Sequence, residues 1–335
     1  MNKENFPFIS IVITVRNVEK TIHKCITSLI NQTYPHEKYE IIIVDGGSKD
    51  GTLRILKEFQ AKYKKIKVIE APNVTIGAGR NKGIKASKGD IIAITDGDIV
   101  VDTYWLENIA NSFLTYEIGC VGGPIFTYNN CNRFAKYVGM LPEESLRLVD
   151  EGYVSHDLVY TRNIAYAKKA LEEAGFFNEF LAAAEDPELN WRIERKGYKI
   201  LFNPKMIVYH IHRSNIKDYI KQHIRNGIGD GQLLKLNRGI RKTPLRILYL
   251  TLFLLTIISL IMYNIHIFFK VLTILFIAFF IIICYWKAMM SYKISKSLVS
   301  LLVIPPLSAV GMVSWIIGVI LGLLFKRIKY ITCPK

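Results

Sequence analysis

Short apolar runs alternate with amphipathic segments through the first hundred residues of the chain. The runs are rich in β-branched residues and have the length of buried strands, and the segments between them repeat apolar side chains at helical spacing. We expect strands at residues 8–15, 41–44, 67–70 and 90–95, and helices at 21–30, 52–63 and 77–86. Strands that alternate with helices predict an α/β domain built on a parallel sheet.

Acidic residues follow two of these predicted strands directly. Asp45 closes the second strand, and Asp96 and Asp98 follow the fourth. Ligands of such sheets bind at the carboxyl ends of the strands, so the three carboxylates are expected at one edge. Asp96 and Asp98 can point to the same side of extended backbone, and Gly97 would let a ligand approach between them. Two carboxylates suit Mg²⁺ or Mn²⁺ together with a substrate phosphate. Asp-Gly is also ordinary turn chemistry, so a solvated turn is the alternative.

A second group of candidate residues lies between residues 185 and 225. Glu185 and Asp186 precede a short helical pattern, where an acidic pair either complements the helix dipole or supplies a general base. His210 and His212 end a further predicted strand on one side of it, and either could complete a metal site begun by Asp98. The basic side chains that could neutralise a diphosphate here are Arg213, Lys221 and Arg225.

Apolar residues dominate the last third of the chain. Three runs carry no acid and almost no base, at residues 247–263, 267–286 and 297–325. A helix needs about 20 apolar residues to cross a bilayer, so these runs predict about three membrane spans. Pro305 and Pro306 interrupt the third run, which is either a re-entrant pair or one long kinked helix.

The formal net charge of +16 raises the question whether the basic residues face a membrane or a nucleic acid. The basic residues cluster beside the apolar runs, as expected at the cytoplasmic face of a membrane. They lack the interleaved aromatic residues of a nucleic-acid site, so we expect no nucleic-acid partner. Five cysteines without CxxC spacing indicate reduced thiols. The sequence therefore predicts a multi-pass protein of the cell membrane whose soluble domain lies in the cytoplasm.

Several short motifs occur in an order that resembles one known family. They are "SIVITVRN", "IIIVDGGSKDGT", "GAGRNKGIKASKGDIIAITDGDIV" and "YTRNIAYAKKALEEAGFFNEFLAAAEDPELNWR". In this order they resemble the family 2 glycosyltransferases of GT-A fold, and the apolar C-terminal part resembles the succinoglycan-type membrane subgroup. The resemblance implies a GT-A nucleotide-diphospho-sugar transferase domain at residues 1–235, with a mostly parallel sheet flanked by helices. It implies a basic juxtamembrane linker at 236–246, a transmembrane region at 247–325 and a basic tail at 326–335.

The same resemblance implies roles for individual residues. Asp186 would be the catalytic base, Asp98 the principal ligand of Mg²⁺ or Mn²⁺, and His210 a candidate second metal ligand. The donor-binding residues would be Asp45, Arg80, Asn81, Lys88, Asp96 and Arg225.

The reaction expected from these roles is an inverting, metal-dependent glycosyl transfer. The donor would be a nucleotide sugar, and the acceptor a polyprenyl or dolichyl phosphate or an oligosaccharide carried on one. One base and no obvious nucleophile favour a single displacement. A catalytically silent nucleotide-sugar-binding membrane partner and a processive polysaccharide synthase are the alternatives. The Gln-x-x-Arg-Trp motif of processive synthases is matched only at Gln222 and Arg225, with Asn226 in place of Trp.

Overall fold

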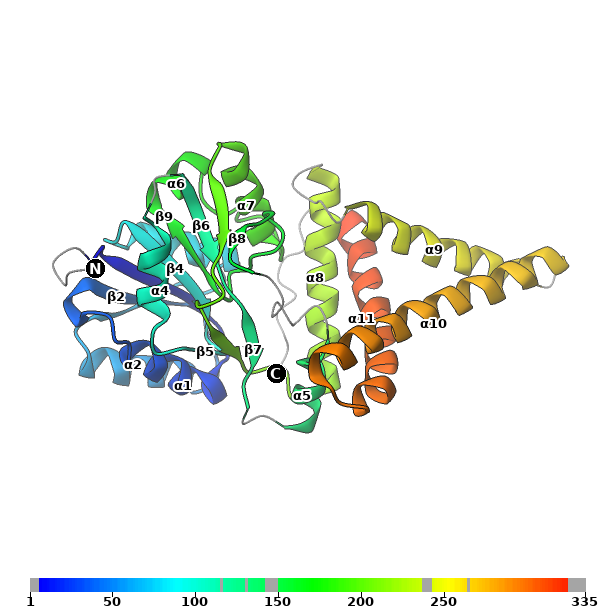
Figure 1. The fold of residues 1–335 in the computed structure, drawn as a ribbon, viewed down its shortest axis with the longest axis horizontal. Coiled ribbons are helices and arrows are strands. Elements are labelled where there is room, and N and C mark those ends of the chain that lie inside the picture. The colour runs from blue at the N-terminus through cyan, green and yellow to red at the C-terminus, as the bar shows by residue number, and fades with distance from the viewer. Residues whose placement is uncertain are drawn as a thin grey trace. The chain divides into compact units, whose positions relative to one another are not determined.

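The computed structural model describes residues 6–114, 117–129, 132–141, 150–236, 243–263 and 266–324. These residues form two compact units (Figure 1). The first contains the described residues up to 132 and from 150 to 212, and the second those from 133 to 141 and from 213 to 324. Residues 237–242 of the predicted basic linker and the predicted tail at 326–335 lie outside the described residues. The predicted domain boundary at residue 235 stays a prediction.

A mixed eight-stranded sheet is the centre of the first unit, with the strand order β3-β2-β1-β4-β9-β6-β10-β8. The strands are β1 (Ile9–Val15), β2 (Tyr39–Asp45), β3 (Ile66–Glu70), β4 (Ile91–Asp96), β6 (Ile118–Gly122), β8 (Gly152–Tyr153), β9 (Ile164–Ala167) and β10 (Lys199–Phe202). The four strands predicted in the first hundred residues pair in parallel, whereas β9 runs antiparallel between β4 and β6. The predicted α/β class is confirmed, with a mixed sheet.

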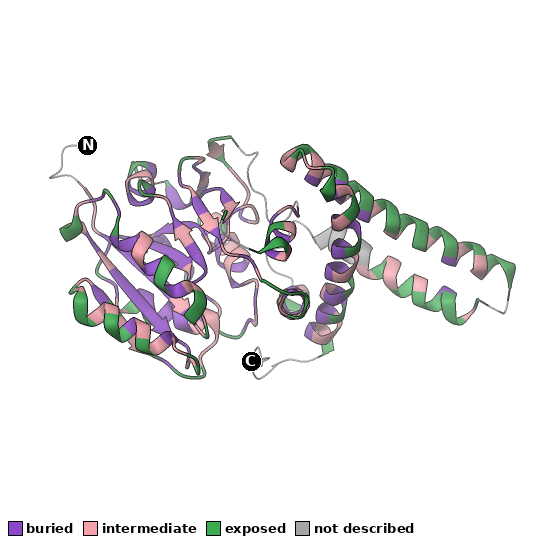
Figure 2. Ribbon diagram, turned by 90° about the horizontal axis from the view of Figure 1, so that it is seen from below, coloured by how far each residue is buried: buried purple, intermediate pink, exposed green. Residues whose placement is uncertain are grey.

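Helices cover both faces of this sheet (Figure 2). They are α1 (Glu19–Ile30), the 3₁₀ helix η2 (His36–Lys38), α2 (Thr52–Lys62), α3 (Ile76–Lys85), α4 (Trp105–Ser112), α6 (Lys168–Ala174) and α7 (Glu185–Arg195). Alternate residues of β1 explain the layering, because successive side chains of a strand point to opposite faces. Ile11 and Ile13 pack in one core with α1 and α4, while Val12 packs in the other with α3, α6 and α7.

The register of β1 brings the acidic strand ends together. Val15 pairs with Asp45 of β2, and Thr14 pairs with Asp96 of β4. Both carboxylates therefore lie at the carboxyl edge of the sheet, one on each side of β1. The expectation that these acids meet at one edge is confirmed for Asp45 and Asp96.

A smaller sheet continues from this edge. It orders β5 (Ile99–Val101), β11 (Val208–His210) and β7 (Ile125–Thr127) with β11 in the middle. His210 pairs with Ile99, and the amide of Ile211 donates to the carbonyl of Asp98 at 2.9 Å. This pairing holds the end of β11 beside the acidic turn after β4.

The second unit is helical in its described residues. Its helices are α5 (Arg133–Val138), α8 (Ile216–Leu236), α9 (Thr243–Ile261), α10 (Ile267–Ser295) and α11 (Val299–Leu324). Helices α10 and α11 are long and apolar enough to cross a membrane, and the described apolar segment of α9, Leu250–Ile261, is shorter. The described residues thus contain two candidate spans, where the sequence predicted about three. Helix α11 is continuous through Pro305 and Pro306, which corresponds to the single-helix alternative.

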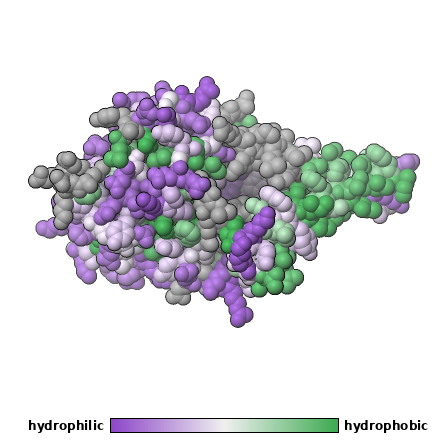
Figure 3. Space-filling view, in the orientation of Figure 1, coloured by the Kyte–Doolittle hydropathy of each residue, from purple (hydrophilic) through white to green (hydrophobic). Residues whose placement is uncertain are grey.

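Apolar side chains remain exposed along α9 and α10, and hydrophobic surface gathers over them (Figure 3). Inside this pair, the Thr273 hydroxyl donates to the Ser259 hydroxyl at 2.9 Å, so two buried polar groups satisfy each other. An extended apolar surface of this kind is typical of a membrane or protein contact.

Helices α8 and α11 approach each other closely through glycines. A Cβ atom at Gly318 would lie 2.1 Å from the carbonyl oxygen of Ile224 and 2.9 Å from the Cα of Gly227. Nearby, the Trp315 indole donates to Asp230 at 2.8 Å. The absence of side chains at both glycines is what lets the two backbones meet.

Candidate active site

Asp45 ends β2 and closes a polar turn. Its carboxylate accepts hydrogen bonds from the Ser48 amide at 3.0 Å and the Ser48 hydroxyl at 2.5 Å. The Ser48 hydroxyl also accepts from the amide of Asn17 at 2.9 Å, which ties the loops after β1 and β2 together. Asp45 is buried, and these contacts fix the Gly-rich loop at the carboxyl edge of the sheet.

Gly97 separates the two aspartates after β4 for a packing reason. A Cβ atom there would lie 2.8 Å from the Cγ1 of Val15 and 3.2 Å from the Cγ2 of Val18. Its carbonyl accepts a hydrogen bond from the Thr21 hydroxyl at 2.8 Å. The glycine therefore lets the acidic turn pack against β1 and the start of α1, a requirement that does not depend on a ligand.

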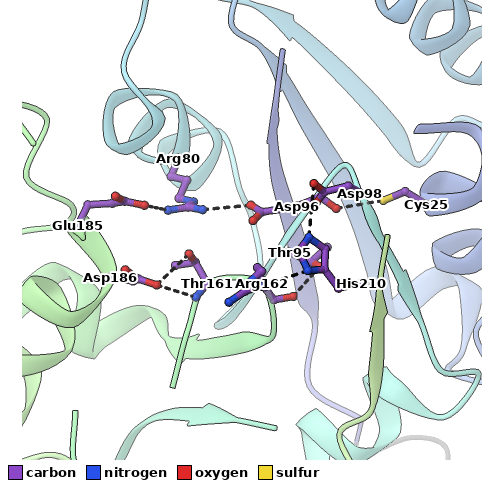
Figure 4. Close-up of polar contacts among 10 residues, drawn as sticks. All are labelled: Cys25, Arg80, Thr95, Asp96, Asp98, Thr161, Arg162, Glu185, Asp186 and His210. Carbon is purple, nitrogen blue, oxygen red and sulfur yellow. Dashed lines mark hydrogen bonds and ion pairs between the residues drawn. The ribbon is translucent and has the colours of Figure 1, made fainter. Parts of the chain in front are cut away.

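Arg80 links the two acidic segments of the site. Its guanidinium bonds Asp96 through Nη2 at 3.1 Å and Glu185 through Nη1, and all three groups are drawn in Figure 4. Burial alone would lower the pKa of Arg80, but the charges of Glu185 and Asp96 outweigh it and raise that pKa. The buried cation thus holds the start of α7 against the end of β4.

Asp186 lies in the first turn of α7, directly after Glu185. Ala184 before the pair adopts a left-handed backbone with φ of 61°. The amide and hydroxyl of Thr161 both donate to Oδ2 of Asp186, at 3.1 and 3.2 Å (Figure 4). The side chain is partly exposed, yet desolvation by the surrounding protein, and then the charge of Glu185, raises its pKa to about 6. A carboxyl group poised in this range can act as a general base near neutral pH.

One face of α7 holds the loop that carries Thr161. Residues four apart share a helix face, and Asp186, Asn190 and Glu194 follow this spacing. Asn190 donates to the carbonyls of Val159 at 3.2 Å and His156 at 3.1 Å, and Glu194 contacts the His156 ring at 2.8 Å. Loop 156–161 is therefore attached to α7 at three successive turns, which fixes Thr161 relative to Asp186.

Asp98 and His210 face each other at the end of the smaller sheet. Oδ2 of Asp98 lies 3.6 Å from Nε2 of His210, and both residues are buried. The other ring nitrogen of His210, Nδ1, lies 3.2 Å from Nη1 of Arg162 (Figure 4). The described residues contain no group of three or more His, Cys, Asp or Glu side chains that could hold a metal ion.

A carboxylate and an imidazole nitrogen nevertheless fit a divalent cation that takes its remaining ligands from substrate phosphate and water. Mg²⁺ sites in particular use few protein ligands. The carboxylate of Asp98 can bind such a cation as it stands. His210 can bind it through Nε2 only if Nδ1 carries the proton, because a ligating imidazole nitrogen uses its lone pair to bind the metal.

Comparison with known proteins identifies the family. The model of glycosyl transferase family 2 matches residues 10–175. Glycosyltransferase AglE of Haloferax volcanii is 32% identical over 238 residues, which cover 69% of this chain and 76% of the relative. The chain belongs to the family 2 glycosyltransferases.

A second relative has a more detailed name. It is the dolichyl N-acetyl-alpha-D-glucosaminyl phosphate 3-beta-D-2,3-diacetamido-2,3-dideoxy-beta-D-glucuronosyltransferase of Methanococcus voltae. It is 31% identical over 241 residues, covering 68% of this chain and 74% of that enzyme. The family 2 assignment predicted from the motifs is confirmed, and with it the prediction that the protein is an enzyme.

Solved structures agree on the fold. The mannosyltransferase PcManGT from Pyrobaculum calidifontis, in complex with GDP-Man and Mn²⁺, has a TM-score of 0.56 at 15% identity, covering 96% of this chain and 88% of that one. The structure of TarS residues 1–349 from S. aureus, in complex with UDP-GlcNAc, has a TM-score of 0.52 at 19% identity. The match covers 70% of this chain and 68% of that one. The predicted GT-A fold of this glycosyltransferase is confirmed.

Two predicted donor-binding residues are not part of the acidic cluster, and a third lies in the other unit. Asn81 uses its amide to bond Phe177 and Glu179, so it holds the loop before α7. Lys88 is exposed and precedes β4, and its amide bonds the Glu40 carboxylate near the start of β2, at the edge opposite Asp96. Arg225 lies on α8 in the second unit. The structure thus brings together Asp45, Arg80, Asp96, Asp98, Asp186 and His210.

Three residues of the cluster have contacts that were not predicted. Glu185 was expected as one of an acidic pair that complements the helix dipole or supplies a base, yet it is the buried partner of Arg80. Thr161 and Arg162 lie in the quoted "YTRN" segment, on a loop whose path the sequence does not reveal. An arginine in a quoted family motif was the available signal, and it is weak because most arginines are solvated charges.

Proposed function

We propose that this glycosyltransferase moves a sugar from a nucleotide-sugar donor to a lipid-linked acceptor, with inversion at the anomeric carbon and with a divalent cation. The observation that carries the proposal is Asp186. It is a carboxyl group with a pKa raised to about 6 that is linked, through Glu185 and Arg80, to the acidic strand end at Asp96. This arrangement supports the proposal of a general base beside the edge where ligands bind to such sheets.

The donor would bind across the carboxyl edge. Asp45 and its fixed loop suit the nucleoside, and Asp96 suits the ribose or the sugar hydroxyls. Both terminal nitrogens of Arg80 already contact carboxylates, so Arg80 would position Asp96 rather than bind phosphate directly. Lys88 is no longer proposed as a donor ligand because it lies at the opposite edge of the sheet.

Asp98 and His210 are the proposed ligands of Mg²⁺ or Mn²⁺. A bound cation would neutralise charge on the departing nucleoside diphosphate. Asp186 would accept the proton of the attacking hydroxyl, while Thr161 keeps its carboxylate oriented. Among the described carboxylates of this cluster, Asp96 and Glu185 are paired with Arg80 and Asp98 is the proposed metal ligand. This leaves none of them as a nucleophile beside the base Asp186, which favours one displacement and hence inversion.

The need for a base also bears on the acceptor. A phosphate group is already ionised at neutral pH and attacks without losing a proton, whereas a sugar hydroxyl needs a proton acceptor. A base at Asp186 therefore favours the hydroxyl of a saccharide carried on a lipid phosphate over the lipid phosphate itself. The name of the Methanococcus voltae relative describes an acceptor of this kind.

The second unit would hold the enzyme at the membrane where such acceptors are found. Helices α10 and α11 have the length and the exposed apolar side chains of membrane spans. We propose a multi-pass protein whose catalytic unit lies on the cytoplasmic side, where nucleotide sugars are made.

Sugar transfer by the purified full chain tests the proposal. The protein in detergent would receive Mn²⁺ or Mg²⁺, a panel of nucleotide sugars, and either polyprenyl phosphate or lipid-linked saccharide from a membrane extract. We expect transfer to the saccharide, an inverted anomeric product, and a loss of at least about 10³-fold in Asp186→Asn and Asp98→Ala. Glu58→Gln, an exposed carboxylate on α2, is the matched control.

Other outcomes identify the alternatives. Nucleotide binding without transfer of any donor would favour a silent membrane partner, and products of many added sugars would favour a processive synthase. Full transfer to polyprenyl phosphate by Asp186→Asn would show that this acceptor needs no base.

A further inference from the structure

Arg162 and His210 restrict each other's hydrogen bonding. A guanidinium group has only donors, so the contact of Arg162 Nη1 with His210 Nδ1 at 3.2 Å requires a lone pair on Nδ1. The proton of the neutral ring is then on Nε2, which faces Oδ2 of Asp98 at 3.6 Å. Figure 4 shows this sequence of contacts from Arg162 through His210 to Asp98.

A divalent cation bound at Asp98 and His210 requires the opposite position of the proton on the His210 ring. His210 can ligate the cation through Nε2 only with its lone pair there, and the proton must then be on Nδ1. That N–H would point at the N–H groups of Arg162. The contact between Arg162 and His210 and the bond between His210 and a cation therefore exclude each other.

The backbone around Arg162 is held by contacts that do not involve its guanidinium group. The Arg162 carbonyl accepts a hydrogen bond from the Thr95 hydroxyl at 2.9 Å. The next residue, Asn163, is buried and donates to the carbonyls of Pro124 and Met206. On the other side, Thr161 is bonded to Asp186. A guanidinium released from His210 thus stays at the acidic edge, where a diphosphate would be its strongest partner.

We propose that Arg162 is a ligand of the donor diphosphate that is coupled to the cation site through His210. In the cation-free protein it donates to His210 Nδ1, and with a cation bound at Asp98 and His210 it turns to the diphosphate. The inference rests on the proposed metal site. By thermodynamic linkage, diphosphate and cation then each tighten the binding of the other.

Mn²⁺ binding to the full chain in detergent, followed by the electron paramagnetic resonance of free Mn²⁺, tests the coupling without any glycosyl transfer. Arg162→Gln supplies a carbonyl that can accept from Nδ1–H, so we expect its Mn²⁺ affinity without nucleotide to rise about 5- to 20-fold. When Arg162→Gln is titrated with UDP and GDP at saturating Mn²⁺, we expect its nucleotide affinity to be about 10-fold or more below that of the unaltered protein.

Two further variants separate this mechanism from a general charge effect. Arg54→Gln removes an exposed arginine from α2, and we expect neither affinity to change. His210→Phe keeps a ring but removes both nitrogens, so adding Arg162→Gln to it should leave Mn²⁺ affinity unchanged. An unchanged Mn²⁺ affinity in Arg162→Gln, or the same rise in the His210→Phe background, would overturn the inference.

These outcomes are distinguishable from failure of the proposed function. Mn²⁺ binding that is lost in Asp98→Ala but unaltered in Arg162→Gln would overturn only the role of Arg162. No Mn²⁺ binding by the unaltered protein would overturn both the metal site and the coupling.

Discussion

Thr161 donates two hydrogen bonds to one oxygen of Asp186, from its amide at 3.1 Å and from its hydroxyl at 3.2 Å. Both bonds stabilise the ionised form of the carboxyl group, whereas burial and Glu185 disfavour it. The balance of these effects decides the pH range in which Asp186 can accept a proton.

Replacement of Thr161 by Val removes the hydroxyl and keeps the amide and the side-chain shape. We expect the pKa of Asp186 to rise by about one unit, because a hydrogen bond to a charged group is worth about 1.5 to 3 kcal/mol. The measurement is the pH dependence of kcat, whose lower limb should move to higher pH. Thr33→Val, far from the site in the loop after α1, should leave the profile unchanged.

The unaltered enzyme should gain activity as pH rises through about 6. Below that pH Asp186 is protonated and cannot accept a proton, and above it the carboxylate predominates. If Asp186→Asn keeps residual activity, its kcat profile should lack this lower limb, because the variant has no carboxyl group at position 186 to titrate. A profile that is flat from pH 5 to 8 would contradict the assignment of Asp186 as base.

The raised pKa of Asp186 also makes a prediction about stability. The folded pKa of about 6 exceeds the value of 3.8 for an unperturbed Asp, so the folded state favours the proton. This stabilising contribution is complete below the unfolded pKa and is lost as pH rises through the folded one. We therefore expect Asp186→Asn to raise Tm by about 2–4 °C at pH 8, and to have little effect at pH 4, as measured by thermal unfolding.

Arg80→Met should destabilise the first unit. The change leaves Glu185 buried without its cation, and breaking a buried ion pair in this way costs about 3 to 5 kcal/mol. Arg54→Met breaks an exposed pair with Glu58 and should cost less than about 1 kcal/mol. Chemical unfolding of both variants measures the difference, and equal losses would show that the Arg80 pair contributes no special stability.

Gly318→Leu should prevent α8 and α11 from packing. Even a Cβ atom at Gly318 would overlap the Ile224 carbonyl, and that carbonyl belongs to the helix backbone and cannot move aside. We expect a loss of about 3 kcal/mol or more and a changed fluorescence of Trp315, which bonds Asp230 nearby. Ile317→Leu, at an exposed neighbouring position, is the control and should change neither observable.

The sequence by itself determined the first four strands, β1 to β4, their order along the chain and the acids that follow β2 and β4. Period-two alternation decides which residues of β1 face each core, and it does so locally, through backbone geometry. The positions of Asp45 and Asp96 at one edge follow from the same reasoning, because parallel neighbouring strands end on the same side. The antiparallel direction of β9 could not be predicted from the sequence pattern, since strand direction depends on the path of the connecting loops.

Only the tertiary structure decided which polar groups meet. Arg80 and Glu185 are 105 residues apart, and no spacing along the chain predicts their contact. Lys88 and Asp96 are close in sequence but lie at opposite ends of β4, because a strand separates its two ends in space. The choice of Thr161 and Arg162 as partners of Asp186 and His210 depends on a loop attached to α7 by side chains. Such contacts are set by the packing of whole elements, which local patterns of residues do not encode.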